Sequence, residues 1–144
     1  MEAFIEAHRI AVAINAPDPS IAQLLNNLAL CAQQMHEWKK ATDYCERCLR
    51  VRRNYQQETH AEYIKCSNSL ANCYYRLRKY KDAKKIYDDV LLINTRKFGE
   101  THVDTMRAMH NSGLMAFHSG QTAAAQKVLT SCLRLRENIL GLFV

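Results

Sequence analysis

The sequence predicts an all-α fold, a right-handed α-solenoid of three antiparallel helix pairs behind one leading helix. Three observations support this prediction. Apolar residues recur at helical spacing along most of the chain, only four of 144 residues are Gly and two are Pro, and segments of the chain superpose at a shift of 42 residues. A repeat of that length with one break in each unit indicates a helical hairpin stacked on copies of itself.

The middle repeat, 58–99, shows the pattern most clearly. Thr59 with Glu62 three residues later is typical of a helix start at which side chain and backbone cap each other. An apolar stripe follows, breaks near 77–79, and resumes in a second helix. Gly99 then predicts a left-handed residue that closes the unit.

The flanking segments repeat this organisation. We expect helices over about 19–35 and 37–54 in the first repeat, and over 101–119 and 121–138 in the third. Thr101 and Asp104 restate the helix start seen at Thr59 and Glu62. In a single domain, the expected division is a leading helix from a partial repeat at 1–16, repeats at 17–57, 58–99 and 100–141, and a tail at 142–144.

Small residues recur at two points of the repeat. The coinciding sets are Ala29, Ala71 and Gly113, then Ala41, Ala83 and Ala125. Two helices approach closely only where no large side chain intervenes, so these positions predict the helix–helix contacts. Leu49, Leu91 and Leu133 also coincide, which three unrelated hairpins would rarely do by chance.

A helix pair with these small residues, and with Trp38 or Tyr80 opening its second helix, resembles the tetratricopeptide repeat. The 42-residue period and joints such as Phe-Gly-Glu-Thr-His-Val at 98–103 are similar to the kinesin light chain type of this repeat. The third repeat departs from the pattern, because Thr122 replaces the aromatic residue. The resemblance implies a non-catalytic adaptor or scaffold whose first helices line a concave groove.

The residues of the first helices that lie off the packing stripe are the predicted peptide-binding site. They are Gln23, Asn26, Asn27, Leu30, Lys65, Asn68, Asn72, Tyr75, Arg76, Arg107, His110 and Asn111. An amide side chain both donates and accepts a hydrogen bond, which suits it to the backbone of an extended peptide. The cations Lys65, Arg76 and Arg107 favour acidic side chains. The alternative is a solvated polar surface without a ligand.

Other partners are predicted from charge and from the chain end. The net charge of +6 favours acidic partners in general. The densest basic run, Arg76 to Lys85, is an alternative site for an acidic surface or, less favoured, for RNA. The apolar end 140–144 favours self-association or a neighbour, in which case the chain would be a subunit of a larger assembly that uses its ends and a basic convex edge.

Catalysis, metals and cofactors are not predicted. The six cysteines fall mostly on apolar helical positions and are expected in the core, and the pair Cys45 and Cys48 lacks the second pair of a zinc site. His110 and His118 lie roughly 12 Å apart along one helix by its rise per residue, too far to share a metal. The sequence contains none of the common nucleophile or phosphate-loop motifs.

The chain start and its hydropathy predict a location. The opening residues 1–6 lack the basic start and long apolar stretch of a secretory signal. The sequence also has no run of 18 apolar residues, which a membrane-spanning helix would need. We therefore expect a cytoplasmic protein, and the resemblance adds association with the cytoskeleton.

Overall fold

The computed structural model describes residues 2, 5–6, 9, 19–54 and 60–141. From residue 19 onward the described residues form six helices and no strand. Their bounds are α2 (Pro19–Gln34), α3 (Trp38–Asn54), α4 (His60–Arg76), α5 (Tyr80–Phe98), α6 (Val103–His118) and α7 (Thr122–Leu140). The predicted helices are confirmed. Thr59, the tail 142–144 and most of the expected leading helix lie outside the described residues.

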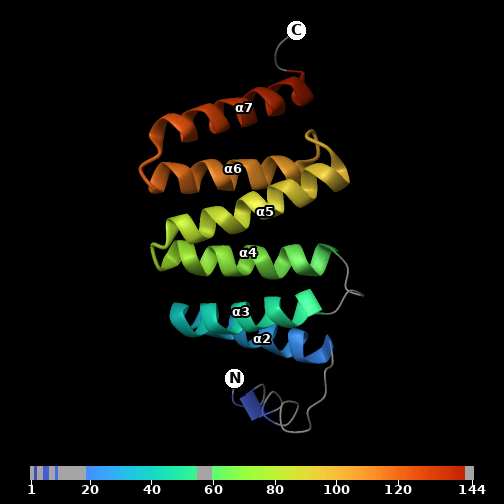
Figure 1. Ribbon diagram of the computed structural model, residues 1–144, viewed down its shortest axis with the longest axis vertical. Helices are drawn as coiled ribbons and strands as arrows, with labels where there is room; N and C mark the ends of the chain where they lie inside the picture. Colours follow the sequence, from blue (N-terminus) through green and yellow to red (C-terminus); the bar gives the residue numbers. More distant parts are fainter. Residues whose placement is uncertain (1, 3–4, 7–8, 10–18, 55–59, 142–144) are drawn as a thin grey trace. The chain divides into compact units, whose positions relative to one another are not determined.

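The helices fall into two compact units, Met1–Leu77 and Arg78–Val144. In the first unit α3 contacts both α2 and α4, and in the second unit α6 contacts both α5 and α7 (Figure 1). Each unit therefore contains one hairpin formed by consecutive helices of a predicted repeat, together with one helix of the middle repeat.

The 42-residue period is visible in the backbone. The second helix of each predicted repeat begins at Trp38, Tyr80 or Thr122, which are 42 residues apart. The residue two places before each of these helices has a positive φ: 59° at His36, 60° at Arg78 and 85° at Gly120. A left-handed residue thus recurs at the same position of each turn, although only the third turn uses the residue type that favours this conformation.

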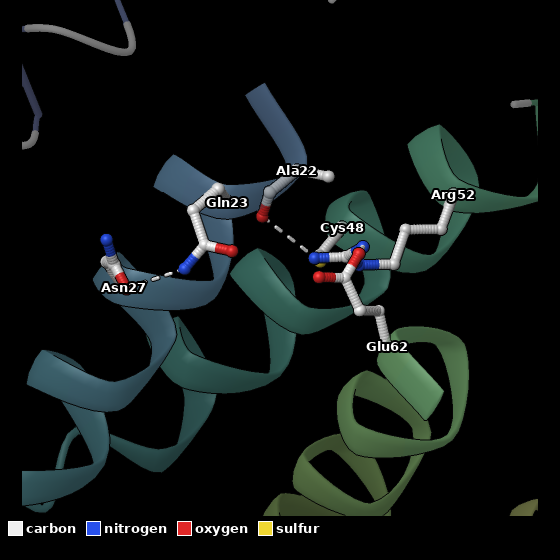
Figure 2. Close-up of polar contacts among 6 residues, drawn as sticks. All are labelled: Ala22, Gln23, Asn27, Cys48, Arg52 and Glu62. Atoms are coloured by element: carbon white, nitrogen blue, oxygen red, sulfur yellow. Dashed lines mark hydrogen bonds and ion pairs between the residues drawn. The ribbon is translucent and has the colours of Figure 1, made fainter. Parts of the chain in front are cut away.

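The core of the first unit is built from the predicted apolar stripes. The buried residues include Leu25, Leu28 and Ala29 of α2, Ala41 and Cys45 of α3, and Leu70 and Ala71 of α4. The Cys48 thiol on α3 donates a hydrogen bond to the carbonyl oxygen of Ala22 on α2 over 3.3 Å (Figure 2). All six cysteines are free, and all but the half-buried Cys31 are buried, which confirms their predicted place in the core.

The second unit repeats these contacts. The Cys132 thiol donates to the carbonyl oxygen of Met106 over 3.4 Å, and both residues lie 84 positions, two repeats, after Cys48 and Ala22. A Cβ added to Gly113 would lie 2.8 Å from the Leu129 side chain, so α6 and α7 meet closely at this predicted small residue. The matching thiol bonds support the predicted equivalence of the first and third repeats.

The start of α6 corrects one prediction. Its N-cap residue is His102, whose Nδ1 accepts a hydrogen bond from the backbone N–H of Asp104 over 3.1 Å. The helix begins at Val103, which places Thr101 one residue before the cap. The His102 ring also stacks on Phe98, with centroids 4.3 Å apart. Thr101 was expected to cap this helix, but the stacked imidazole occupies that position.

We expect Gly120→Ala to lower the free energy of unfolding by about 1 kcal/mol, because an L side chain is strained at positive φ. A Cβ at this position would meet no atom within 4 Å, so the loss would come from the backbone alone. Urea denaturation followed by circular dichroism measures the effect. The control is Gln121→Ala, because the exposed Gln121 side chain makes no capping hydrogen bond. Equal stability of the two variants would contradict the prediction.

Candidate functional site

A cavity of about 130 Å³ lies among α2, α3 and α4 of the first unit. Its walls are Gln23, Asn26, Arg52, Ala61, Glu62, Lys65 and Cys66. Three of these residues, Gln23, Asn26 and Lys65, belong to the predicted peptide-binding set and come from two different first helices. The fold thus brings residues that are some 40 positions apart in the sequence to one polar cavity.

An ion pair forms one side of this cavity. Arg52 Nη1 at the end of α3 donates to Glu62 Oε2 in the first turn of α4 over 3.0 Å (Figure 2). The Arg52 side chain is 4% exposed and that of Glu62 is 51% exposed, so the cation is buried and the carboxylate reaches solvent. A buried guanidinium needs such a partner, because an uncompensated charge in the interior is costly.

Arg52 was not among the predicted site residues. It lies three residues after Leu49 on the packing stripe of α3, and a basic residue at a core position is the feature that could have identified it. Glu62 had been assigned to a cap with Thr59. Thr59 lies outside the described residues, and the Glu62 carboxylate is bonded to Arg52.

The predicted amide residues differ in their environments. Asn26 is only 5% exposed and forms part of the cavity wall. Gln23 is exposed and donates from Nε2 to Asn27 Oδ1 over 3.3 Å, as Figure 2 shows. Asn68 is exposed on α4, whereas Asn72 is half-buried. Gln23 and Asn68 are therefore the amides of this set most open to an incoming chain.

The remaining predicted residues of the first unit lie along α2 and α4. Leu30 is 40% exposed and Tyr75 is half-buried. The Arg76 guanidinium lies over the Trp38 ring, with Cζ 5.3 Å from the ring centroid, a favourable cation–π distance. That contact holds the exposed Arg76 side chain against α3.

Three predicted residues belong to the second unit, on α6. Arg107 is exposed, and its Nη1 lies 3.5 Å from Oδ1 of Asp104 one turn earlier. His110 and Asn111 are half-buried. An exposed ion pair of this kind contributes little to stability, so Arg107 can exchange its partner at small cost.

A second cavity, of about 280 Å³, lies in the second unit at the start of α5 and the turn after α6. Arg78, Lys79, Tyr80, Lys81, Asp82 and Ser119 line it. The Tyr80 ring stacks on His118 with centroids 4.9 Å apart, which agrees with its predicted packing role. Phe117 beside His118 is 54% exposed. Three exposed cations and exposed aromatic surface thus meet at one end of this unit.

Buried thiols face each other across α3 and α4. The Cys45 thiol donates to the sulfur of Cys73, and this bond lowers the pKa of Cys73 to about 7, although burial acts in the opposite direction. Gln33 Nε2 also donates to Cys73 Sγ, over 3.3 Å. The same thiol–thiol bond, together with burial, raises the pKa of Cys45. Within the described residues no group of three or more His, Cys, Asp or Glu side chains has the geometry of a metal site.

None of the described helices combines the length and apolar character needed to cross a bilayer.

Comparisons with known proteins agree with this geometry. A family model of the tetratricopeptide repeat matches residues 20–91 and again residues 65–138. A search of curated proteins finds no match. Among solved structures, a putative kinesin light chain from Podosopora anserina with nearly identical TPR-like repeats superposes with a TM-score of 0.81 at 16% identity, covering 96% of this chain and 66% of that one.

Two further structures are similar. BtubC (BKLC) from P. vanneervenii gives a TM-score of 0.76 at 23% identity, over 94% of this chain and 54% of its own. A TPR-like protein from Chlorobium tepidum gives 0.61 at 20% identity, over 81% of this chain and 78% of its own. The fold is therefore that of TPR-like helical repeats, as predicted, and the chain spans 66% and 54% of the kinesin light chain-type structure and of BtubC.

We expect Glu62→Gln to lower the free energy of unfolding by about 2 kcal/mol, because it neutralises the carboxylate that pairs with the buried Arg52 guanidinium over 3.0 Å. The matched control is Asp43→Asn, which removes an exposed carboxylate 3.1 Å from Arg47 and should cost less than about 0.5 kcal/mol. Denaturant titration measures both. Adding Arg52→Met to Glu62→Gln should restore most of the loss, since an apolar residue of similar size needs no partner. Equal effects of Glu62→Gln and Asp43→Asn would contradict the structural role.

Proposed function

This chain belongs to the tetratricopeptide repeat family, and on that premise we propose that it is a non-catalytic adaptor or scaffold that holds an extended acidic peptide on α2 and α4. The observation that carries the proposal is the polar cavity where Gln23, Asn26 and Lys65 meet. Repeats of this family generally mediate interactions between proteins. The amides and the lysine at this cavity favour an extended acidic peptide as the partner.

The proposed mode of binding follows from what each group offers. The exposed amides Gln23 and Asn68 can donate to carbonyl groups and accept from N–H groups of a peptide backbone, whatever its sequence. Lys65 borders the cavity as an exposed cation, and it would pair with an Asp or Glu side chain of the peptide. Arg76, at the end of α4, would add attraction for acidic residues further along the peptide. A cytoplasmic, cytoskeleton-associated location belongs to the same proposal, because a similar structure is named as a kinesin light chain.

We expect Lys65→Glu with Asn68→Leu to weaken peptide binding about tenfold or more, because the change reverses the charge at the cavity and removes an amide from α4. The probes are peptides selected on this chain from a random display library, which should be enriched in Asp and Glu. Fluorescence anisotropy with the labelled peptides gives the Kd.

The matched control for this test is Lys85→Glu, an equal charge change at an exposed position of α5. It should leave the affinity within a factor of about two, and circular dichroism should show unchanged helicity in both variants. Selected peptides without acidic enrichment, or an affinity insensitive to the double substitution, would place the peptide site elsewhere.

The second cavity favours a second candidate function, docking to an acidic surface within a larger assembly. Arg78, Lys79 and Lys81 are exposed there, with Asp82 as the acidic residue of the lining. A concentration of like charge speeds and orients encounter with an oppositely charged partner. Unpaired RNA bases stack on exposed aromatic side chains such as Phe117, so RNA binding is tested as an alternative.

We expect Arg78→Glu, Lys79→Glu and Lys81→Glu together to weaken binding of poly-glutamate about tenfold, because they invert the charge around the second cavity. The control reverses three exposed cations of α3, Lys39, Lys40 and Arg47, for the same change in net charge. Single-stranded oligouridylate serves as the competing probe. If oligouridylate binds, and its binding falls steeply with added salt and is lost in the triple Arg78, Lys79 and Lys81 variant, the partner of the second cavity is RNA and not an acidic protein surface.

A further inference from the structure

The second cavity has a net positive charge that its own side chains do not balance. Its volume is about 280 Å³, and its charged lining residues are Arg78, Lys79, Lys81 and Asp82. Three cations against one carboxylate leave a net charge of +2. Within the part of the chain that the structure describes, no ion pair involves any of the three cations. Their charges are therefore available to an anion from outside the chain.

The turn before α5 does not need these cations for its structure. The turns before α3 and α7 have a left-handed residue at the same position. In place of Arg78, Lys79 and Lys81, the first turn and its helix have His36, Glu37 and Lys39, and the third have Gly120, Gln121 and Ala123. In the first turn Glu37 also pairs with Lys40 over 2.8 Å, so a carboxylate of the chain supplies the counter-charge there. The unbalanced cluster of cations is thus a property of the middle repeat.

Arg78 occupies a backbone position that disfavours its side chain. Its φ is 60°, whereas the equivalent residue Gly120, with a φ of 85°, adopts a left-handed conformation without strain. A residue with a Cβ incurs a steric cost in this region. Residues held in such conformations cluster at binding and catalytic sites, which makes the Arg78 guanidinium a candidate contact for a ligand.

The other groups at the cavity leave the cations to hold the anion. Ser119 Oγ donates its hydrogen to the carbonyl oxygen of Met115 over 2.7 Å, so this hydroxyl can only accept from a ligand. The Tyr80 ring stacks on His118, and Phe117 packs edge-on against His118 with centroids 5.6 Å apart. Phe117 is 54% exposed and offers apolar contact to the group that carries the anion.

From this charge and these neighbours we infer that the second cavity binds a phosphorylated side chain of a partner protein. A phosphate monoester carries a charge of roughly −1.5 to −2 near pH 7, which matches the lining, whereas a carboxylate or an RNA phosphodiester carries a single charge. The Arg78 guanidinium can donate two parallel hydrogen bonds to phosphate oxygens, and Lys79 and Lys81 add point charges. Residues that flank the phosphorylated one pack on Phe117, which a free phosphate ion would leave uncovered.

This inference rests on the second candidate function, docking to an acidic surface, and makes that docking dependent on phosphorylation of the partner. The test adds three labelled peptides of alanine and leucine to the full chain, with phosphoserine, Glu or Ser at the centre, and measures Kd by fluorescence anisotropy. We expect the phosphoserine peptide to bind about tenfold more tightly than the Glu peptide, and the Ser peptide not to bind.

Arg78→Gly separates binding from folding. It should weaken the phosphoserine peptide about tenfold, because the bidentate donor is lost. It should not lower the midpoint of thermal unfolding, because Gly adopts a positive φ without strain. Lys81→Gln should weaken the same peptide in a chain that keeps Arg78. The matched control is His36→Gly, the same backbone position in the turn before α3, which should leave the affinity unchanged.

Equal affinity for the phosphoserine and Glu peptides, or an affinity that Arg78→Gly does not change, overturns the inference. If poly-glutamate binding is then still lost in the triple Arg78, Lys79 and Lys81 variant, docking to an acidic surface stands without the preference for phosphate. Inorganic phosphate that binds as tightly as the phosphoserine peptide also overturns the inference, because the ligand is then a free ion. Tighter binding of oligouridylate overturns it in favour of RNA.

Discussion

Close approach of paired helices at small side chains is the constraint on which this structure depends. Ala29, Ala41, Ala71, Ala83 and Ala125 recur at two points of the repeat, and each is buried almost completely. Only at such a distance can a thiol reach the backbone of the neighbouring helix, as Cys48 and Cys132 do. A larger side chain at these points would force the helices apart and typically costs 1 to 3 kcal/mol (a rough range).

Two long polar side chains meet where α3 ends and α4 begins. They are Arg52 and Glu62, whose charged groups lie 3.0 Å apart. A buried ion pair adds little net stability, but it can select one register over another. The end of α3 is tied in this way to the first turn of α4, which also carries Lys65 beside the cavity.

The helices and their 42-residue period could be predicted from the sequence because both follow from local patterns. Trp38, Tyr80 and Thr122 were each aligned as the residue opening a second helix, and each begins one. The positive φ of His36 and Arg78 was not predictable, since nothing in those side chains favours it and the surrounding turn imposes it. The family resemblance suggested a groove, but it could not indicate that Asn26 is buried whereas Asn68 is exposed.

That last difference points to where function should be sought in a repeat protein. Equivalent positions have the same backbone geometry, so differences in burial among them come from which neighbour is present and which side chain is used. At 52, 94 and 136 the residues are Arg, Asn and Arg, and the first two are buried while the third is exposed. At 26, 68 and 110 they are Asn, Asn and His, with burial falling from Asn26 to Asn68. Positions whose residue type and burial recur in every repeat form the scaffold. Positions at which the residue type or the burial differs between repeats are available for binding.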